Sequence, residues 1–332
     1  MRKVLLATTA LVAMTGYAAA DVSLAAFYEF GYTSSSDDRT DASADQDAMF
    51  SDAEYHITFS ETTDSGLTFS AKYELEGQAS TEATRSASQI DEASLTISSA
   101  EMGSLVLGNN DMASASFQTW LPGSRGAATG DDNQYSLKNK GGTALTSGLT
   151  SRSNGATYGD TLTTAYFTPS LGGAKIGISI TDSGTEEDTS MGFSYTGDLA
   201  GSAFTLTGAT WSNNETTETD NVSLGVSFSI GGADVALSTS TTESGTTYDT
   251  TTSGAGIGFS LADGMNVYAA MAKSEDDVTS DTLDTVSISM DYSIAPGLSF
   301  AAAMNTYSYE DASASTSNND ADEIVVSIQA NF

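Results

Sequence analysis

Charged side chains at alternate positions of one short segment are the residues here best suited to act on dissolved ions. Between residues 67 and 77, Lys72, Glu74 and Glu76 recur at every second position. Successive side chains of a strand point to opposite faces, so these three would share one face. Fixed charges on a water-exposed face attract, repel and orient ions without making or breaking a bond. The full set of candidate residues with this role is Lys72, Glu74, Glu76, Arg85, Asp111, Arg125, Asp131 and Asp132.

Residues for catalysis or for a metal centre are sparse. His56 is the only histidine and the chain has no cysteine, which excludes a His/Cys metal site and a Cys/His dyad. His56 lies on the polar face of an alternating segment, where a water-facing side chain explains it better than a Ser-His-Asp set does. We therefore expect no enzyme activity and no cofactor. Calcium held by acidic loops stays open, although the EF-hand spacing is missing.

Alternation of apolar and polar residues recurs along the whole chain and ends it. Ile324, Val326, Ile328, Ala330 and Phe332 lie on one side of the last segment, with polar residues mostly on the other. Short Gly- or Pro-containing connections at residues 231–233, 262–264 and 295–297 have the residues of tight turns, and the other connections are long and polar. This pattern predicts an all-β fold, a transmembrane antiparallel β-barrel of about 16 strands with both ends on the short-turn side.

The composition is compatible with a barrel and excludes a helical membrane protein. Only 39% of the residues are hydrophobic, mean hydropathy is −0.17, and no long apolar stretch follows the N-terminus. In a barrel every second strand residue faces water, so window averages hide the membrane signal. A soluble β-sandwich or an adhesin stalk is the alternative. Aromatic residues near strand ends favour the barrel, because they resemble a membrane girdle: Tyr28, Phe30, Tyr32, Tyr292, Tyr307 and Tyr309.

Alternation lapses over residues 109–155, which we expect to form the longest loop. A barrel of about 16 strands leaves a wide aqueous channel, so a loop folded inward would narrow it. We expect Phe117 and Trp120 to pack the loop against the wall rather than to bind a ligand, because aromatic residues commonly serve packing. The glycine-rich residues 254–258 lack the helix and lysine of a nucleotide loop, and are predicted to lie where the wall bends or a neighbour approaches.

The N-terminus has the features of an export signal. Arg2 and Lys3 precede an apolar run over residues 4–14, and alanines at 18–20 precede Asp21. The run is too short for a membrane-spanning helix, so we expect cleavage after residue 20 and a barrel over residues 21–332. The formal net charge of −33 and the scattered bases exclude nucleic acid as a partner. Acidic loops near a pore mouth would instead raise the local concentration of cations.

Several short segments together resemble the general outer-membrane porins of alphaproteobacteria such as Rhodobacter. They are the N-terminal residues 1–13, Asp21-Val22-Ser23-Leu24 after the alanines, Leu107-Gly108-Asn109 before the long loop, and the C-terminal residues 326–332. The resemblance implies a homotrimer of 16-stranded barrels in the outer membrane of a Gram-negative bacterium, in contact with lipid and lipopolysaccharide. It further implies a third loop inside each pore and passive diffusion of small hydrophilic solutes. Phe332 would be part of the signal read by the barrel-assembly machinery.

The family pattern also implies an acidic loop facing a cluster of bases on the wall, and the sequence departs from it. Only Lys72 and Arg85 lie where early wall strands could supply bases, while Lys138, Lys140 and Arg152 fall in or near the loop. We therefore expect a pore that prefers cations. A substrate-specific channel or, more remotely, an adhesin barrel remains the alternative.

Overall fold

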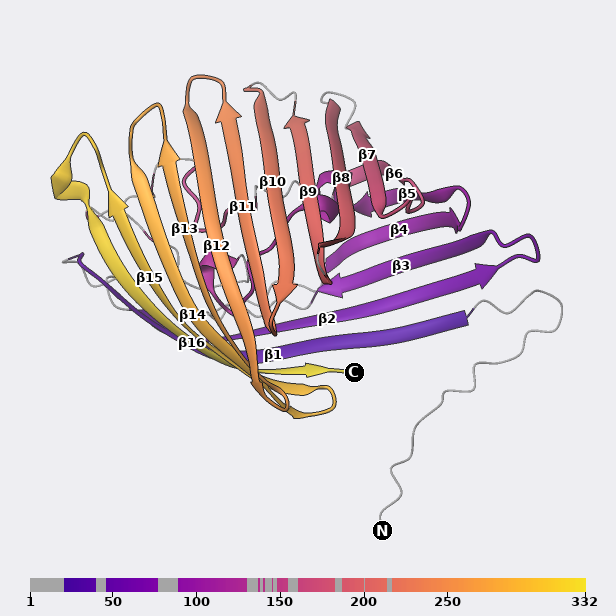
Figure 1. The fold of residues 1–332 in the computed structure, drawn as a ribbon, viewed down its shortest axis with the longest axis horizontal. Helices are drawn as coiled ribbons and strands as arrows, with labels where there is room; N and C mark the ends of the chain where they lie inside the picture. Colours follow the sequence, from indigo (N-terminus) through magenta and orange to yellow (C-terminus); the bar gives the residue numbers. More distant parts are fainter. Residues whose placement is uncertain are drawn as a thin grey trace, which may run out of the picture.

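The protein is a closed barrel of 16 antiparallel strands, as the sequence predicts (Figure 1). The computed structural model describes residues 21–39, 46–76, 89–129, 137, 140, 145, 148–154, 161–182, 187–199, 201–213 and 217–332. Each strand pairs with its neighbours in sequence, and β1 closes the barrel against β16. The strands are β1 (Asp21–Asp37), β2 (Gln46–Thr62), β3 (Thr68–Glu76), β4 (Gln89–Ser99), β5 (Gly103–Asn110), β6 (Thr161–Phe167), β7 (Ala174–Asp182), β8 (Glu187–Leu199), β9 (Ser202–Asn213), β10 (Thr219–Ile230), β11 (Ala233–Ser244), β12 (Tyr248–Ala262), β13 (Met265–Asp276), β14 (Thr282–Ala295), β15 (Leu298–Glu310) and β16 (Asn319–Asn331).

The two faces of each strand differ in the way the alternation predicts. In β7, Ile178 and Ile180 are about half exposed on the outside, whereas Ser179 and Thr181 are buried. The same division recurs in β14, where Ile288 faces outward between buried serines. An apolar outer face suits contact with lipid, and a hydroxyl-rich inner face suits contact with water.

Short turns gather at the end of the barrel where the chain ends (Figure 1). Gly231 and Gly232 have φ of 60° and 85°, in the left-handed region that glycine adopts at little cost. Phe332 at the C-terminus donates its N–H to the carbonyl of Ala26 in β1 at 2.9 Å. Both ends of the barrel therefore lie on the short-turn side.

The aromatic residues divide into two groups, and one part of the girdle prediction is wrong. Tyr28, Phe30, Tyr32 and Tyr292 are exposed on the outer face. Tyr307 and Tyr309 are only 3% exposed and point inward, where their hydroxyls donate to buried carboxylates. They sit opposite the buried Ala321 and Asn319 of β16, so strand register places them on the inner face.

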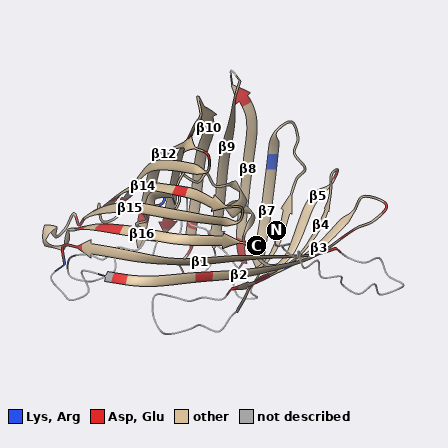
Figure 2. Cartoon of the chain, turned by 90° about the horizontal axis from the view of Figure 1, so that it is seen from below, with Lys and Arg blue, Asp and Glu red and all other residues tan. Residues whose placement is uncertain are grey.

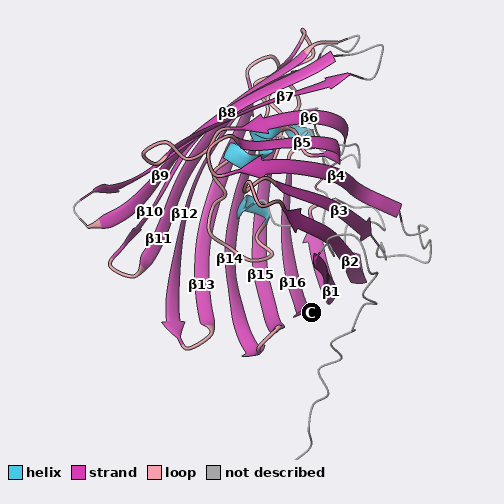
Figure 3. Cartoon of the chain, turned by 90° about the vertical axis from the view of Figure 1, so that its right-hand side faces the viewer, coloured by secondary structure: helices cyan, strands magenta, loops and turns pink. Residues whose placement is uncertain are grey.

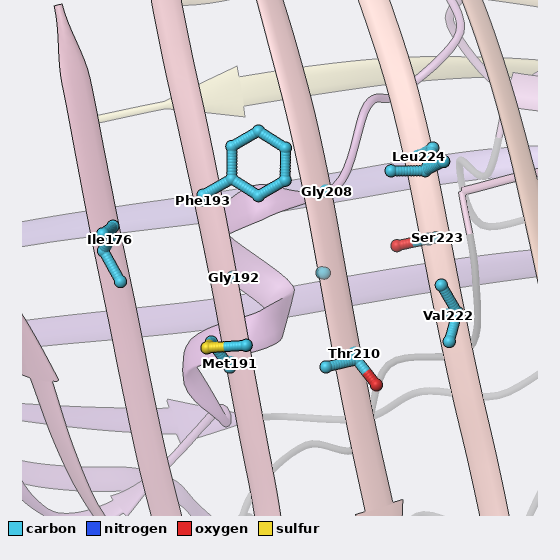
Figure 4. Close-up of a pocket in the computed structure, with 10 residues that line it drawn as sticks. Ile176, Met191, Gly192, Phe193, Gly208, Thr210, Val222, Ser223 and Leu224 are labelled. Atoms are coloured by element: carbon cyan, nitrogen blue, oxygen red, sulfur yellow. The ribbon is translucent and has the colours of Figure 1, made fainter.

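The outer wall of β7 to β10 carries a shallow apolar groove of about 460 Å³ (Figure 4). Phe193 and Leu224 flank Gly208, which has no side chain to fill the space between them. Ile176, Met191 and Val222 complete the apolar lining. Surface of this kind is compatible with acyl chains. Among the described residues, no helix is long and apolar enough to cross a membrane.

Candidate functional site: a pore crossed by an anchored loop

The described residues of the third long connection, between Asn110 of β5 and Thr161 of β6, run through the interior of the barrel (Figure 3). They include two short 3-10 helices, η1 (Ala113–Phe117) and η2 (Ala127–Thr129). Their backbone N–H groups donate to inner-wall side chains: Ala113 to Ser179 at 3.0 Å, Ser114 to Ser190 at 3.0 Å, Ala128 to Ser287 at 2.9 Å and Ala127 to Asn305 at 2.9 Å. The loop therefore crosses from β7 and β8 to β14 and β15. Wall hydroxyls satisfy backbone donors that would otherwise be buried unpaired.

Glycines on the inner face make room for the loop. A Cβ at Gly192 would lie 2.6 Å from Cγ of Phe117, and one at Gly177 would lie 2.5 Å from its Cε2. Phe117 is 1% exposed and packs the loop against the wall, as predicted.

The glycine-rich part of β12 does the same at the other side of the loop. A Cβ at Gly254 would lie 2.9 Å from Leu121 Cδ1, and one at Gly256 would lie 2.9 Å from Pro122 Cδ. The prediction of close approach at residues 254–258 is confirmed. Wall glycines thus form the surface on which the loop packs.

Arg125 fixes the far end of the loop to β1. Its Nε donates to Oε1 of Glu29 at 2.8 Å, and its Nη2 also contacts that carboxylate. The guanidinium lies 5.4 Å from the ring centroid of Phe50, and the backbone carbonyl of Arg125 accepts a bond from Asn305 at 3.3 Å. Arg125 is only 5% exposed and has a positive φ of 57°. The expectation that it lines the open pore is therefore corrected: it anchors the loop.

A second buried carboxylate extends this anchor to the last strands. Glu323 accepts hydrogen bonds from Thr33 at 3.0 Å, Asn305 at 2.9 Å and Tyr307 at 3.0 Å. Glu29 accepts a further bond from Gln329 at 3.1 Å. The first strand, the last strands and the loop are held by one network, and a buried charge is tolerated where it is paired and hydrogen-bonded.

Lys72, Glu74 and Glu76 all lie on the inner face of β3, and register brings further acids beside them. Glu76 is opposite Glu54, and Glu74 is opposite His56. Lys72 Nζ lies 2.8 Å from Glu74 Oε2, within salt-bridge range. Glu54 and Asp52 were not predicted from the sequence, although both alternate with the outward-facing Tyr55 and so belong to the inner face.

A β-bulge adds two more acids to this wall. Ile90 pairs with Leu75 and Ala93 with Tyr73, so Asp91 and Glu92 both stand opposite Glu74. Such a bulge turns adjacent side chains toward one face, which strict alternation forbids. Glu92 Oε2 lies 2.6 Å from Lys72 Nζ. Alternation alone could not have found this pair of acids.

Asp111, at the start of the loop, faces the same cluster. Burial and the nearby carboxylates of Glu92 and Asp91 raise the pKa of Asp111 above its ordinary value, and Lys72 opposes this shift. We name as the acidic wall the six acids of β2 to β4 that flank Lys72: Asp52, Glu54, Glu74, Glu76, Asp91 and Glu92. Figure 2 shows that acidic positions far outnumber basic ones along the described strands.

Among the described residues, two overlapping groups at the acidic wall, one of which includes the neighbouring His56, could hold a divalent cation. Glu54, His56 and Glu74 form one, and Asp52, Glu54 and Glu76 form the other, each with ligand atoms within 4.8 Å of one another. The second group is all carboxylate, the donor that Ca²⁺ prefers. His56 lies 3.2 Å from a carboxylate oxygen at each ring nitrogen, from Glu54 and from Glu74.

The other residues of interest from the sequence are either exposed or outside the described part of the chain. Trp120 is 46% exposed, so it does not pack the loop to the wall as Phe117 does. Arg85, Asp131 and Asp132 lie outside the described residues.

The comparisons with known proteins agree with this architecture. A family model described as "Gram-negative porin" matches residues 7–329. No curated protein sequence matches the chain. Three similar solved structures are an anion-selective porin from Comamonas acidovorans (13% identity, TM-score 0.68, 94% of this chain and 100% of that chain), the trimer form of OmpT of Vibrio cholerae (11%, 0.65, 95% and 100%), and a mutant of Rh. blastica porin (17%, 0.61, 94% and 100%). At these identities the likeness concerns the fold.

Proposed function

The chain belongs to the Gram-negative porin family, whose members are outer-membrane diffusion channels, and from this membership we propose that it is a general diffusion porin that prefers cations. Small hydrophilic solutes and ions would pass between the anchored loop and the acidic wall. Passage needs no bond chemistry, and the absence of a Cys/His dyad in the sequence agrees with a passive channel.

One observation carries the preference for cations, namely the composition of the acidic wall. Among the described residues, six carboxylates surround a single Lys or Arg side chain, Lys72, which is itself engaged by Glu74 and Glu92. Uncompensated acids in a confined aqueous passage attract cations and repel anions, and the low-dielectric barrel wall strengthens that field. The Comamonas acidovorans relative is described as anion-selective, so we propose that these two similar folds select opposite charges.

The anchored loop would set the size limit. Its hydrogen bonds to Ser179, Ser190 and Ser287, and its ion pair to Glu29, hold it at both sides of the barrel. A loop held at two ends cannot swing out with thermal motion as a free loop would. Solutes would therefore be sorted by size at the loop and by charge at the wall.

We further propose a homotrimer of the alphaproteobacterial type in contact with lipid and lipopolysaccharide. The Vibrio cholerae relative is described in a trimer form. Outward apolar residues of β1 and β16, among them Leu24 and Ile328, give a surface for a neighbouring subunit.

Residues 1–20 would be removed on export, and Phe332, which is 81% exposed, is available to the barrel-assembly machinery. Calcium held by acidic loops is also part of this proposal.

The test is single-channel recording in a planar bilayer across a KCl gradient. Wild type should give stepwise ohmic currents, in triplets for a trimer, with K⁺ more permeant than Cl⁻. The double variant Glu54→Gln and Glu76→Gln should lower the K⁺/Cl⁻ permeability ratio, because it removes two inner charges at constant volume. Asp263→Asn, in the exposed β12–β13 turn, is the matched control. An anion-preferring wild type would overturn the cation preference, and absent conductance would favour a closed adhesin barrel.

A further inference from the structure

Residues 119–122 of the loop form a bridge over β10 and β11. At one end, Thr119 Oγ1 lies 2.6 Å from Thr207 Oγ1 of β9, and the Thr119 side chain fills the space above Gly225. At the other end, Pro122 packs on Gly256 of β12. The strands between these two contacts are β10 and β11, so the intervening residues must cross them.

The two residues in the middle of the bridge differ in exposure. Leu121 is 4% exposed and belongs to an apolar cluster with Ala236 and Ala270 of the wall. Trp120 is 46% exposed, although tryptophan is the largest apolar surface the loop could have buried. The bridge is therefore fixed to the wall by Leu121 and its neighbours and leaves the indole in the open passage.

A cavity of about 290 Å³ lies beside the indole. Trp120 and Pro122 form its loop side, and strand residues near the short β10–β11 turn form the rest. Pairing places Ser227 opposite Thr205, and Ser229 opposite Asp234, so the hydroxyls and the carboxylate share one face of the wall. The cavity thus combines aromatic residues, Trp120 with Phe204 and Phe228, with a small set of polar groups. This composition is typical of small-molecule sites.

Asp234 gives this cavity its charge. Its Oδ1 accepts a hydrogen bond from Ser229 Oγ at 2.5 Å, which orients the carboxylate. Within the described part of the chain, no Lys or Arg forms a salt bridge with Asp234 and no donor reaches its Oδ2. Asp234 is exposed to the passage, so a cation in the cavity would pair with its charge, whereas a neutral solute would not.

We propose that this cavity is a binding site for organic ammonium ions that enter the pore. The exposed indole would receive the ammonium or its methyl groups on its face, an attraction strongest for tryptophan among aromatic side chains. The Asp234 carboxylate would pair with the charge, and Ser227 and Thr205 would accept hydrogen bonds from any N–H groups. The site goes beyond the preference for cations at the acidic wall, because it would bind organic ammonium ions selectively in the cavity beside Trp120. It rests on the proposed function only for the entry of the ion through the pore.

The test uses tetramethylammonium chloride as a probe added to KCl during single-channel recording. In wild type, rising probe concentration should reduce the K⁺ current along a saturating curve. Trp120→Ala should raise the half-blocking concentration by roughly 2- to 30-fold, the range expected for loss of a cation–π contact. Trp120→Phe, which keeps an aromatic face, should lose less, and Asp234→Asn should also weaken the block.

The outcomes separate this site from the general channel function. An unchanged K⁺/Cl⁻ permeability ratio in Trp120→Ala would show that the barrel is intact and the acidic wall unaffected. A linear, unsaturated response of wild type to the probe, or an identical block in wild type and Trp120→Ala, would overturn the site. Equal block by a neutral polyol such as trehalose would overturn the ammonium assignment. Saturable block in a channel without cation preference would instead leave the site standing and reject the proposed selectivity.

Discussion

Arg125 Nε of the loop lies 2.8 Å from Oε1 of Glu29 in β1, and both side chains are buried. The two residues are 96 positions apart in sequence. This pair holds the loop against the wall at the point where the first and last strands meet. The same contact therefore supports the β1–β16 junction and fixes the loop that narrows the pore.

Arg125→Met should both destabilise the barrel and widen the channel. Removing the guanidinium leaves Glu29 buried without its counter-charge, which costs about 3–5 kcal/mol in comparable cases. We expect a lower midpoint in urea-induced unfolding and a larger, noisier single-channel conductance. Arg152→Met, an exposed loop base, is the control. A variant with wild-type conductance and stability would show that the anchor does not hold the loop.

Gly192→Val should disturb the packing of the loop against the wall. The added side chain would occupy the place of the Phe117 ring, and overpacking of this kind costs about 1–3 kcal/mol. Conductance should change together with stability. The double variant with Phe117→Ala should recover part of the stability, because the smaller side chain removes the clash. Equal destabilisation in the single and double variants would argue against this contact.

Lys72→Met should increase the preference for cations, since it removes the positive charge that Glu74 and Glu92 flank. Glu92→Gln should have the opposite effect, because it removes a charge that the bulge turns inward. The K⁺/Cl⁻ permeability ratio measures both. Changes of the same sign in the two variants would contradict the charge-based account.

Cation preference should fall as the solution is acidified from neutral pH. Burial, with Glu92 and Asp91 nearby, raises the pKa of Asp111, so this carboxyl takes up its proton at a higher pH than a solvated aspartate. The passage therefore loses this negative charge earlier on acidification. Reversal potentials between pH 7 and pH 4 would measure the decline, and Asp111→Asn should remove part of it. A pH profile identical in wild type and Asp111→Asn would contradict this assignment.

The membrane barrel could be predicted from the sequence because its signal is local. Each strand repeats an alternation of period two, and Ile178, Ser179 and Ile180 show in three residues which face meets lipid. Close approach at residues 254–258 was also predictable, since glycine in a strand marks a place without room for a side chain. Lys72, Glu74 and Glu76 were assigned to one inner face for the same reason.

Alternation failed where contacts between distant segments decide the outcome. Tyr307 and Tyr309 face inward because strand pairing places them there, although their type suits a membrane girdle. Asp91 and Glu92 share a face because of a bulge, which period-two counting cannot detect.

The sequence by itself determined the barrel, its two-faced wall and its excess of acids, because these follow from strand geometry and composition. Only the tertiary structure decided the role of Arg125. Its loop has no periodicity, and its position depends on a buried carboxylate 96 residues away. The exposure of Trp120 was decided in the same way, by anchors on β9 and β12 that fix the bridge from both ends.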